Sequence, residues 1–441
     1  MIFGGIMAEL KEVDRLTKVC GNEAVLYDEK GLKEYVVDGK RPRVACFPDT
    51  IEKVCRIMEV VQRSHLLVIP RGGGTRVSLG ALSSGYDMAL CLQRLNAFVE
   101  HDAGNFSASA QAGMTLKDFQ EQLKAKGQFL PLDPPFAERS TLGGITAANS
   151  WGPHRLLYGS ARDLVIGIKA VLPGGNVISS GAKTAKQVAG YDLTKLFIGA
   201  IGTLGVIVEV GMRLVSLPEA RATVTCRFSN LKEIREALRS PLLVRRRPAA
   251  LAVVRHFAPA EKVWLIAISF VGIEEVVEES VGVAEGVFSQ PPREAELLSD
   301  TQAAIFWEKI ARLAVAGDDE VVLEVAVPIA STLGMISAVE KILALDRKKA
   351  TLAAHPGLGI INIRFPFGEK GVEGTLDIIR RVRRLAHRRG GSVEIESAPA
   401  EVKDIINVWG TEPDGLDIMR RLKERFDPSG VLSPGRFVGR I

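Results

Sequence analysis

The chain is organised around the run Ser140-Thr141-Leu142-Gly143-Gly144-Ile145-Thr146-Ala147-Ala148-Asn149. More small residues follow in the segment Gly199–Ile207, and the strand-like segment Asp163–Leu172 lies between the two stretches. Glycine lets a backbone approach a ligand closely, and successive exposed N–H groups form a cavity for anions such as a pyrophosphate. Tight turns between packed strands are the alternative interpretation for any single glycine. The density of such sites in one region favours a nucleotide cradle.

Another candidate cradle lies upstream, where the short buried strand Leu66–Pro70 runs into Pro70-Arg71-Gly72-Gly73-Gly74-Thr75-Arg76. A strand feeding three glycines is typical of a phosphate-binding turn, and a flexible turn is the alternative. We find no Gly-x-Gly-x-x-Gly after a strand, so a Rossmann fold is not predicted. The segment Gly181–Thr184 is not a P-loop, because the preceding glycine spacing fails.

Composition limits the class of protein. The chain has 441 residues, enough for two or three domains, and its net charge of +5 is too weak a bias to indicate nucleic-acid binding. Five cysteines without a Cys-x-x-Cys pair argue against a disulfide framework and against an iron–sulfur or zinc site within this chain. The N-terminus is a poor signal peptide, and no apolar run approaches the roughly 20 residues of a membrane span. We expect a cytoplasmic protein, with any attachment to the inner face of the membrane made through partners.

The order of strand-like and helix-like segments predicts an α+β protein in four parts. Residues 1–40 form a mixed lead-in, and residues 41–217 alternate short strands and helices. Residues 218–412 contain two βαβ-type units with antiparallel pairings, which indicates a sheet covered on one face by helices. Residues 413–441 form a C-terminal helix and a tail that returns to the first domain. We interpret the basic side chains of this helix, 415–426, as a solvated face.

Four motifs in register resemble a known family. The loop 70–75, the run 140–149, Tyr158-Gly159 and the segment 202–207 look like the FAD-binding domain of the vanillyl-alcohol oxidase superfamily, of PCMH type. The resemblance implies a two-subdomain FAD-binding domain. It also implies a second, ferredoxin-like α+β cap domain of the FAD-linked oxidase C-terminal type.

Two further stretches narrow the resemblance. The ending 422–436 is similar to the C-terminus of the FAD-linked 2-hydroxy-acid branch of this superfamily. The stretch Gly181–Leu193 resembles a segment of the FAD-binding E subunit of bacterial glycolate oxidase (dehydrogenase) complexes, and Phe306-Trp307 fits the same group.

The resemblance implies where non-covalent FAD would sit. The loop 70–76, as the first glycine run, and the run 140–149, as the second, would hold the pyrophosphate from two sides by backbone N–H groups, and Arg71 or Arg76 would add charge. The isoalloxazine would lie at the seam with the second domain. No histidine lies in the first loop, so covalent attachment there is not expected, and we interpret His154 as a surface or packing histidine. The expected cofactor-binding residues are Pro70, Arg71, Gly72, Gly73, Gly74, Thr75, Arg76, Pro134, Ser140, Thr141, Gly143, Gly144, Ala147, Asn149, Tyr158, Gly159, Val206 and Ile207.

Hydroxy-acid oxidation also needs a clamp for the substrate carboxylate, a base and precise positioning. Competent relatives carry the signature His-x-Gly-Asp-Gly-Asn-x-His in the second domain, which supplies metal ligands and the base. Residues 355–362 keep the leading His355 and both glycines of this signature. Leu358, Ile360 and Asn362 replace its aspartate, asparagine and second histidine.

A second signature of the relatives, Gly-Gly-Ser-x-x-x-Glu-His-Gly, is degraded as well. Residues 390–398 keep Glu396, but Ser397 and Ala398 stand for the histidine and the last glycine. His355 and Glu396 alone are too few ligands for a divalent cation, which typically takes three or more protein ligands. We therefore predict no metal.

The glycine motifs for the cofactor are intact, whereas the two signatures that supply the base and the metal ligands are degraded. This combination predicts an FAD-binding subunit of a multi-subunit glycolate- or lactate-type dehydrogenase. Its FAD would carry electrons or be structural, while a paralogous flavin subunit oxidises the 2-hydroxy acid and an iron–sulfur subunit takes the electrons onward. A self-sufficient FAD-dependent D-2-hydroxy-acid dehydrogenase is one alternative, with His355, Arg364 and Arg155 as its candidate catalytic residues. For Arg364, a salt bridge at the edge of the core is the competing interpretation. A flavin-free structural subunit is the other alternative, and the unbroken glycines argue against it.

Overall fold

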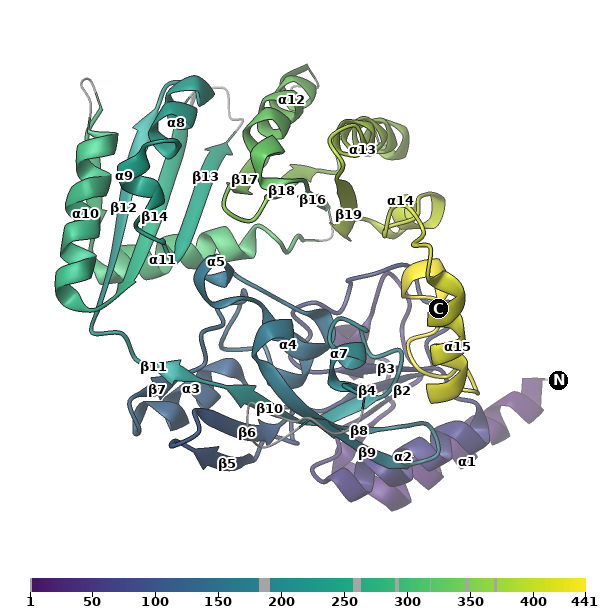
Figure 1. The fold of residues 1–441 in the computed structure, drawn as a ribbon. Helices are drawn as coiled ribbons and strands as arrows, with labels where there is room; N and C mark the ends of the chain where they lie inside the picture. Colours follow the sequence, from purple (N-terminus) through teal and green to yellow (C-terminus); the bar gives the residue numbers. More distant parts are fainter. Residues whose placement is uncertain are drawn as a thin grey trace.

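The computed structural model describes residues 2–181, 191–256, 263–289, 293–317, 319–345, 349–368 and 371–441. Most of the stretch Gly181–Leu193, which carries the resemblance to the E subunit, lies outside the described residues. The chain forms an α+β structure with two lobes, and both termini lie beside the lower lobe of Figure 1.

The lead-in is mostly helical and precedes a small first sheet. Helix α1 packs against α2. Helix α2 follows strand β2 and begins after Thr50, whose side chain caps it by accepting a hydrogen bond from the Lys53 N–H at 3.2 Å. The sheet order is β1-β2-β4-β3, with β4 parallel to both of its neighbours β2 and β3. These elements span α1 Ile2–Cys20, β1 Val25–Leu26, β2 Val44–Cys46, α2 Ile51–Ser64, β3 Val68–Arg71 and β4 Met88–Cys91, with short 3-10 turns at Asn22–Ala24 and Gly31–Tyr35.

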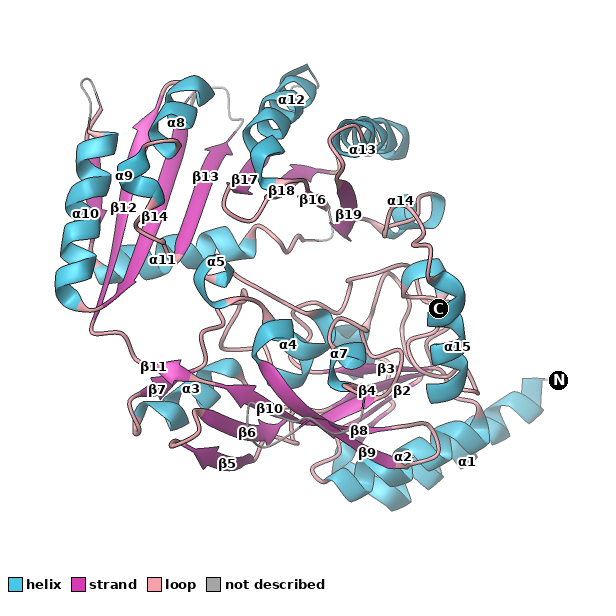
Figure 2. Ribbon diagram, in the orientation of Figure 1, coloured by secondary structure: helices cyan, strands magenta, loops and turns pink. Residues whose placement is uncertain are grey.

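A five-stranded antiparallel sheet forms the second half of the lower lobe. Its order is β5-β6-β10-β8-β9, and helix α4 contacts β10 and β6. A separate strand pair, β7 with β11, lies where the chain leaves for the upper lobe (Figure 2). The elements span β5 Phe98–Asp102, β6 Ser107–Gln111, α3 Leu116–Lys124, β7 Gln128–Phe129, α4 Leu142–Ala148, α5 Arg155–Tyr158, α6 Ala161–Leu164, β8 Val165–Val171, β9 Val177–Gly181, α7 Thr194–Phe197, β10 Val206–Arg213 and β11 Val215–Ser216.

The upper lobe is one antiparallel sheet of eight strands, ordered β15-β12-β14-β13-β17-β18-β16-β19. Each half has the chain order βαββαβ, and each half places its fourth strand beside its first, which is the ferredoxin-like arrangement. The halves join edge to edge where β13 pairs with β17. The expected ferredoxin-like cap is therefore confirmed, and it is doubled. The first half comprises β12 Ala220–Phe228, α8 Leu231–Leu238, α9 Pro241–Val244, β13 Ala250–His256, β14 Trp264–Gly272, α10 Glu274–Phe288 and β15 Ala295–Leu298. Helix α11 Asp300–Arg312 leads to the second half, which comprises β16 Glu320–Ala326, a 3-10 turn at Ile329–Ser331, α12 Thr332–Leu345, β17 Thr351–His355, β18 Ile360–Pro366, α13 Gly371–His387 and β19 Ser392–Ser397.

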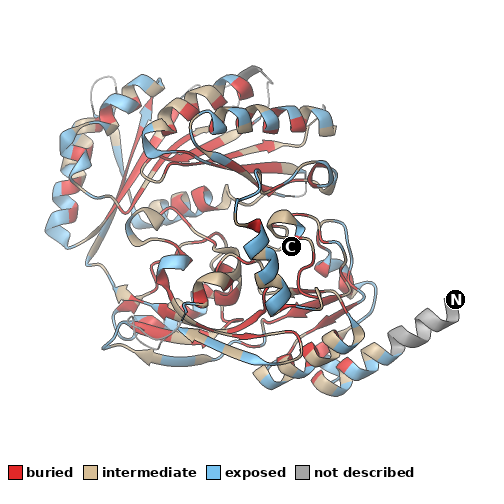
Figure 3. Ribbon diagram, turned by 45° about the vertical axis from the view of Figure 1, so that its right-hand side comes forward, coloured by how far each residue is buried: buried red, intermediate tan, exposed pale blue. Residues whose placement is uncertain are grey.

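Strand alternation gives this sheet two different faces. On β16, Val321, Leu323 and Val325 are fully buried in the core beneath the outer helices, so Glu324 points to the opposite face. The helices α8, α10, α12 and α13 cover the outer face, and buried residues are concentrated between these helices and the sheet (Figures 1 and 3). The inner face looks toward α4 and α5 of the lower lobe, and it carries polar groups on β16, β18 and β19.

The chain then returns to the lower lobe through α14 Ala400–Ile405 and α15 Leu416–Phe426, and it ends in a 3-10 turn at Val438–Arg440. The tail lies beside β3, because the Val68 N–H donates to Val431 O at 2.8 Å and the Ser433 N–H donates to Val68 O at 2.8 Å. One side chain of α15 departs from the expected solvated face. Lys423 Nζ is mostly buried and bonds Thr203 O, Asp427 and Leu432 O, so this lysine anchors the helix instead.

Candidate functional site

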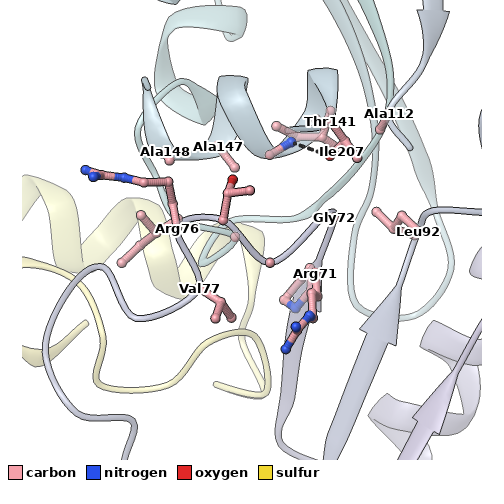
Figure 4. A pocket seen from close by; sticks show the side chains of 18 of the residues that line it. Arg71, Gly72, Arg76, Val77, Leu92, Ala112, Thr141, Ala147, Ala148 and Ile207 are labelled. Carbon is pink, nitrogen blue, oxygen red and sulfur yellow. Dashed lines mark hydrogen bonds between the residues drawn. The ribbon is translucent and has the colours of Figure 1, made fainter. Parts of the chain in front are cut away.

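A pocket of about 770 Å³, partly open to solvent, lies where the two glycine runs meet in the lower lobe. The loop after β3 forms one wall, and the start of α4 forms another (Figure 4). Gly205 and Ile207, from the segment 199–207, also line it. Segments more than 60 residues apart in sequence thus line one cavity.

The first loop offers unpartnered hydrogen-bond donors to this pocket. Within the described residues, the backbone N–H groups of Gly72, Gly73, Gly74, Thr75 and Arg76 donate to no protein acceptor. Five consecutive free amides form an anion-binding concavity, and a buried N–H group rarely stays unpaired without a ligand or water. This loop fits a diphosphate.

The glycines of this loop are required by close packing against the second run. A Cβ on Gly72 would collide with Thr141 Oγ1, and a Cβ on Gly73 would collide with the carbonyl oxygen of Arg139. Gly74 has φ +73°, a conformation that other residues rarely adopt. The two runs therefore lie in direct contact.

The second run differs from the expectation that it would present free amides. The Leu142 N–H donates to Met114 O, the Gly143 N–H donates to Ala112 O at 2.8 Å, and the Gly144 N–H is 3.3 Å from Thr141 Oγ1. Thr141 is the N-cap of α4, and a cap side chain takes up the first helical N–H groups. This run brings its backbone close to the pocket, while the first loop supplies most of the donors.

Three arginines line the pocket, and no acidic residue does. Arg71 stacks over the ring of Tyr35, with its guanidinium 5.1 Å from the ring centroid, and its buried Nε has no partner. Arg436 comes from the C-terminal tail, is 3% exposed and also has a buried, unpartnered Nε. Arg76 is different, because its side chain extends away from the other labelled residues of the pocket (Figure 4). A lining that is cationic only fits an anionic cofactor.

Arg76 instead joins the two lobes. Its Nη2 forms an ion pair with Glu396 on β19, and its Nη1 donates to Ala314 O at 2.6 Å. The side chains of Arg76 and Glu396 are only 15% and 7% exposed. The expectation that Arg76 adds charge to the phosphates is thus poorly matched by its geometry, since its guanidinium is committed to the cap.

The inner face of the cap holds the remnants of the first degraded signature. His355 ends β17, and Asn362 lies on the neighbouring strand β18, where it faces Ala353 across the ladder. The ring of Trp151, from the lower lobe, packs edge-on against His355 with centroids 5.3 Å apart. Burial lowers the pKa of His355 to about 4, and His355 Nδ1 has no hydrogen-bond partner. This histidine is a neutral, covered side chain at neutral pH.

Three glutamates lie beside it on the same face. Glu324 on β16 pairs directly with Glu394 on β19, and Glu396 follows on the same side of β19. Burial, together with the charges of Glu396 and Glu394, raises the pKa of Glu324 to about 8, and burial next to Glu396 raises the pKa of Glu394 to about 7. The indole Nε1 of Trp151 donates to Glu324 Oε2 at 3.2 Å. No group of three or more metal-ligating side chains occurs among the residues whose structure is described.

The remaining candidate catalytic residues also have protein partners. Arg364 forms a two-pronged ion pair with Glu320 on the adjacent strand, with Nε 2.9 Å from Oε1. This pairing lowers the pKa of Glu320. Arg155 lies over the ring of Trp151, 5.2 Å from its centroid. Neither arginine lines the pocket between the glycine runs.

His154 takes part in an arrangement that the sequence did not indicate. Its Nδ1 lies 2.6 Å from Asp133 Oδ2, and its backbone N–H donates to the same oxygen at 3.0 Å. Both residues line a wide groove between the lobes, along with Pro134 and Trp307. Since Asp133 accepts from Nδ1, the Nε2 of this histidine is free to act as a proton acceptor.

The structure brings together most of the expected cofactor residues, and their contacts with a cofactor remain predictions. Those that line the pocket are Pro70, Arg71, Gly72, Gly73, Gly74, Thr75, Arg76, Thr141, Gly143, Gly144, Ala147 and Ile207. Those that lie outside its lining are Pro134, Ser140, Asn149, Tyr158, Gly159 and Val206. Ser140 supports the loop instead, since its Oγ lies 3.0 Å from Thr75 Oγ1.

Several lining residues were missed. They are Val77, Leu79, Leu92, Ala112, Ala148, Ile201, Gly202, Gly205 and Arg436. Ile201, Gly202 and Gly205 belong to the glycine-rich segment 199–207, so the spacing of its glycines was a usable signal. Leu92 and Ala112 stand just after strands β4 and β6 and carry no sequence signal for a ligand.

Comparisons with known proteins agree with this geometry. Residues 42–181 match the family described as FAD binding domain, and residues 217–437 match the family described as FAD linked oxidases, C-terminal domain. The chain is 28% identical to the glycolate oxidase subunit GlcD of Bacillus subtilis, over 98% of this chain and 97% of that protein. It is 25% identical to the mitochondrial D-lactate dehydrogenase [cytochrome] of Arabidopsis thaliana, over 90% of this chain and 73% of that protein. The structure of p-cresol methylhydroxylase with substrate bound superposes with a TM-score of 0.77 at 15% identity, over 97% of this chain and 96% of that one.

Proposed function

The chain belongs to the FAD-linked oxidases, and from that premise we propose that it is the FAD-binding subunit of a multi-subunit 2-hydroxy-acid dehydrogenase of the glycolate or lactate type. In this proposal FAD is held non-covalently and carries electrons or is structural, as in the E subunits that the sequence resembles. A paralogous flavin subunit oxidises the substrate, and an iron–sulfur subunit accepts the electrons.

The cofactor half of this proposal rests on the pocket between the glycine runs. Its free amides and its arginines suit the pyrophosphate, and its small residues admit the backbone close to it. FAD, when bound, supplies the redox chemistry. The chain's own residues bind the cofactor, orient it and exclude water from it.

One observation carries the non-catalytic half: His355 and Glu396, which are left from the degraded signatures, are used in contacts between the lobes. Trp151 covers His355 and bonds Glu324, and Arg76 pairs with Glu396. A general base must reach the hydroxyl proton of its substrate directly or through one water. His355 meets a protein ring instead, and its low pKa makes it a weak base.

The test is anaerobic reduction of the purified, FAD-loaded chain. We expect glycolate or D-lactate to leave the flavin absorbance of the isolated chain unchanged over many minutes. Dithionite should bleach the same sample, which shows that the flavin can be reduced. Adding the paralogous flavin subunit should then allow substrate to reduce the mixture. Rapid bleaching of the isolated chain by either acid would contradict the electron-carrier role.

A self-sufficient D-2-hydroxy-acid dehydrogenase is the second candidate, and the Asp133–His154 pair is the observation that favours it. The pair faces an interdomain groove and resembles an oriented general base. The family comparison also includes proteins named as D-lactate dehydrogenases, which this chain matches over most of its length. If substrate does bleach the isolated chain, a His154→Ala variant decides whether this pair is responsible.

The localisation and the partners stay part of the proposal. Among the described residues, no helix combines the length and the apolar character needed to cross a membrane. The similarity to a protein named as a glycolate oxidase subunit supports a complex. We propose that the subunit works in the cytoplasm and that its partners make any contact with the membrane.

A further inference from the structure

The C-terminal tail forms part of the pocket that the glycine loops build. Residues 431–433 lie beside β3, the strand that leads into the first glycine loop, and Arg436 reaches the pocket itself. Arg436 Nη2 donates to Val77 O and to Leu79 O, the latter at 2.6 Å, so the tail also holds the segment just after the loop. The FAD-binding family match ends at residue 181, so it assigns nothing to this tail.

The charges around Arg436 do not balance. The carboxylate of Asp38 acts on Arg436 by its charge, but it is bonded to Lys403 Nζ at 2.7 Å in a pair whose side chains are 7% and 0% exposed. The Asp38–Lys403 pair is neutral as a whole, so it does not compensate the positive charge of Arg436. Arg71 makes no ion pair with any described residue and contacts the ring of Tyr35 instead.

Two buried or half-buried guanidinium groups without counter-charges therefore face the same cavity. Burying a charge without a partner is strongly unfavourable, so such groups indicate a missing anion. The buried Nε atoms of both arginines have no acceptor in the structure, which independently marks unused donors there. The diphosphate of a dinucleotide carries two negative charges, which match the two unpaired cations.

We propose that Arg71 and Arg436 neutralise the pyrophosphate of FAD, so that the C-terminal tail completes the cofactor site. Arg76, the third arginine of the lining, serves as a tether to the cap through Glu396 and contributes its backbone amide only. This inference rests on the proposed binding of FAD. It adds that the site is shared between the first domain and the last ten residues of the chain.

The experiment measures the dissociation constants of FAD, ADP and adenosine for the full-length apoprotein and its variants by calorimetry. ADP and adenosine differ only in the diphosphate, so the ratio of their constants reports the phosphate contacts. We expect Arg71→Met and Arg436→Met each to weaken FAD and ADP about 10- to 100-fold, because a charge-assisted hydrogen bond is lost. Adenosine binding should change less than about 3-fold.

Arg436→Met also leaves the carbonyl groups of Val77 and Leu79 without this donor, which could destabilise the fold. A second variant therefore distinguishes the loss of charge from a loss of folding. Arg436→Lys keeps the charge and one donor, and it should restore part of the affinity for ADP. Arg421→Met is the matched control, since Arg421 lies on the surface of α15 and pairs with Asp417. Circular dichroism checks that each variant is folded, and Arg71→Met carries the test if the Arg436 variants are not.

Two results would overturn the inference. Equal losses for ADP and adenosine would show that the arginines only shape the pocket. Unchanged ADP affinity in both methionine variants would show that the phosphates lie elsewhere. Failure of the unaltered chain to bind FAD at all is a separate result, and it would remove the proposed function itself.

Discussion

The glycine loop of the lower lobe and the inner face of the cap differ in what they leave unpaired. At the loop, five consecutive amides and the Nε atoms of Arg71 and Arg436 have no protein acceptor. On the cap face, Trp151 covers His355 and bonds Glu324, and Glu396 is paired with Arg76, while His355 Nδ1 and Asn362 Oδ1 stay unpartnered. Unsatisfied polar groups persist in a folded protein where a ligand satisfies them. The unpaired groups of the loop are all donors, which suit an anion, so we interpret the first region as a binding site and the second mainly as a contact that holds the lobes together.

The largest expected effect is a loss of cofactor binding at the glycine loop, which is the binding side of this comparison. Gly73→Val places a side chain where the carbonyl oxygen of Arg139 lies, so the two glycine runs must separate. We expect a nearly complete loss of bound flavin, measured as flavin absorbance per polypeptide after purification in the presence of FAD. Gly282→Ala is the matched control, because a Cβ there meets nothing within 4 Å. Normal flavin content in Gly73→Val would show that the first loop is not part of the cofactor site.

The next effect concerns the inner face of the cap, the side of the comparison that holds the lobes together. Glu396→Ala leaves Arg76 without its partner in a pair that is largely buried. Removing one member of a buried ion pair costs about 3 kcal/mol, which a lower midpoint in urea unfolding would report. Asp417→Ala breaks the exposed pair with Arg421, whose side chains are 70% and 71% exposed, and should cost less than about 1 kcal/mol. Equal losses in the two variants would mean that Glu396 is no tether.

How far the sequence alone predicts this molecule depends on the range of the interaction. The glycine loops were predictable because glycine itself marks places where the backbone comes close to another segment or takes a positive φ, as Gly74 does. The alternation of strands and helices likewise indicated two βαβ-type units with antiparallel pairings, and the family resemblance implied the ferredoxin-like order. The pairing of Arg76 with a residue 320 positions away leaves no local pattern, and Arg76 was accordingly expected at the phosphates.

The amides of the second run show a similar limit. Sequence marks Gly143 and Gly144 as places where the backbone can come close, but their hydrogen-bond partners depend on which strand end lies opposite. The same limit applies to Arg436, whose place in the pocket follows from the tail lying beside β3. Local rules thus identify candidate donors, and only the tertiary structure shows which of them are free.

A third effect sharpens the holding side through its pH dependence. The pKa of Glu324 is about 8 in the folded chain and about 4.5 when unfolded, so the folded state binds the extra proton and stability falls as pH rises through this window. His355 has the opposite sign, since its pKa is about 4 when folded and 6.5 when unfolded, and its contribution grows up to pH 6.5 and is constant above it. Between pH 6.5 and 8 the glutamates therefore dominate.

Urea unfolding of the intact chain at these two pH values measures the effect. Glu324 keeps part of its surface exposed, so we expect a fall of about 1–2 kcal/mol in the free energy of unfolding. Glu324→Gln should flatten this fall, because an amide does not titrate. Glu278→Gln on the exposed face of α10 is the control. An equally steep fall in Glu324→Gln would assign the pH dependence to other groups.

The smallest expected effect asks which part of Trp151 joins the lobes. Trp151→Phe keeps a ring against His355 but removes the indole N–H that bonds Glu324 at 3.2 Å. The net loss of one hydrogen bond with a buried acceptor is about 1 kcal/mol, seen in the urea midpoint. Trp151→Ala should cost more, because the ring contact with His355 and the stacking of Arg155 are also lost. In one outcome, Trp151→Ala also lets glycolate or D-lactate bleach the flavin of the isolated chain. The indole then covers a catalytically competent site, and the cap face does more than hold the lobes together.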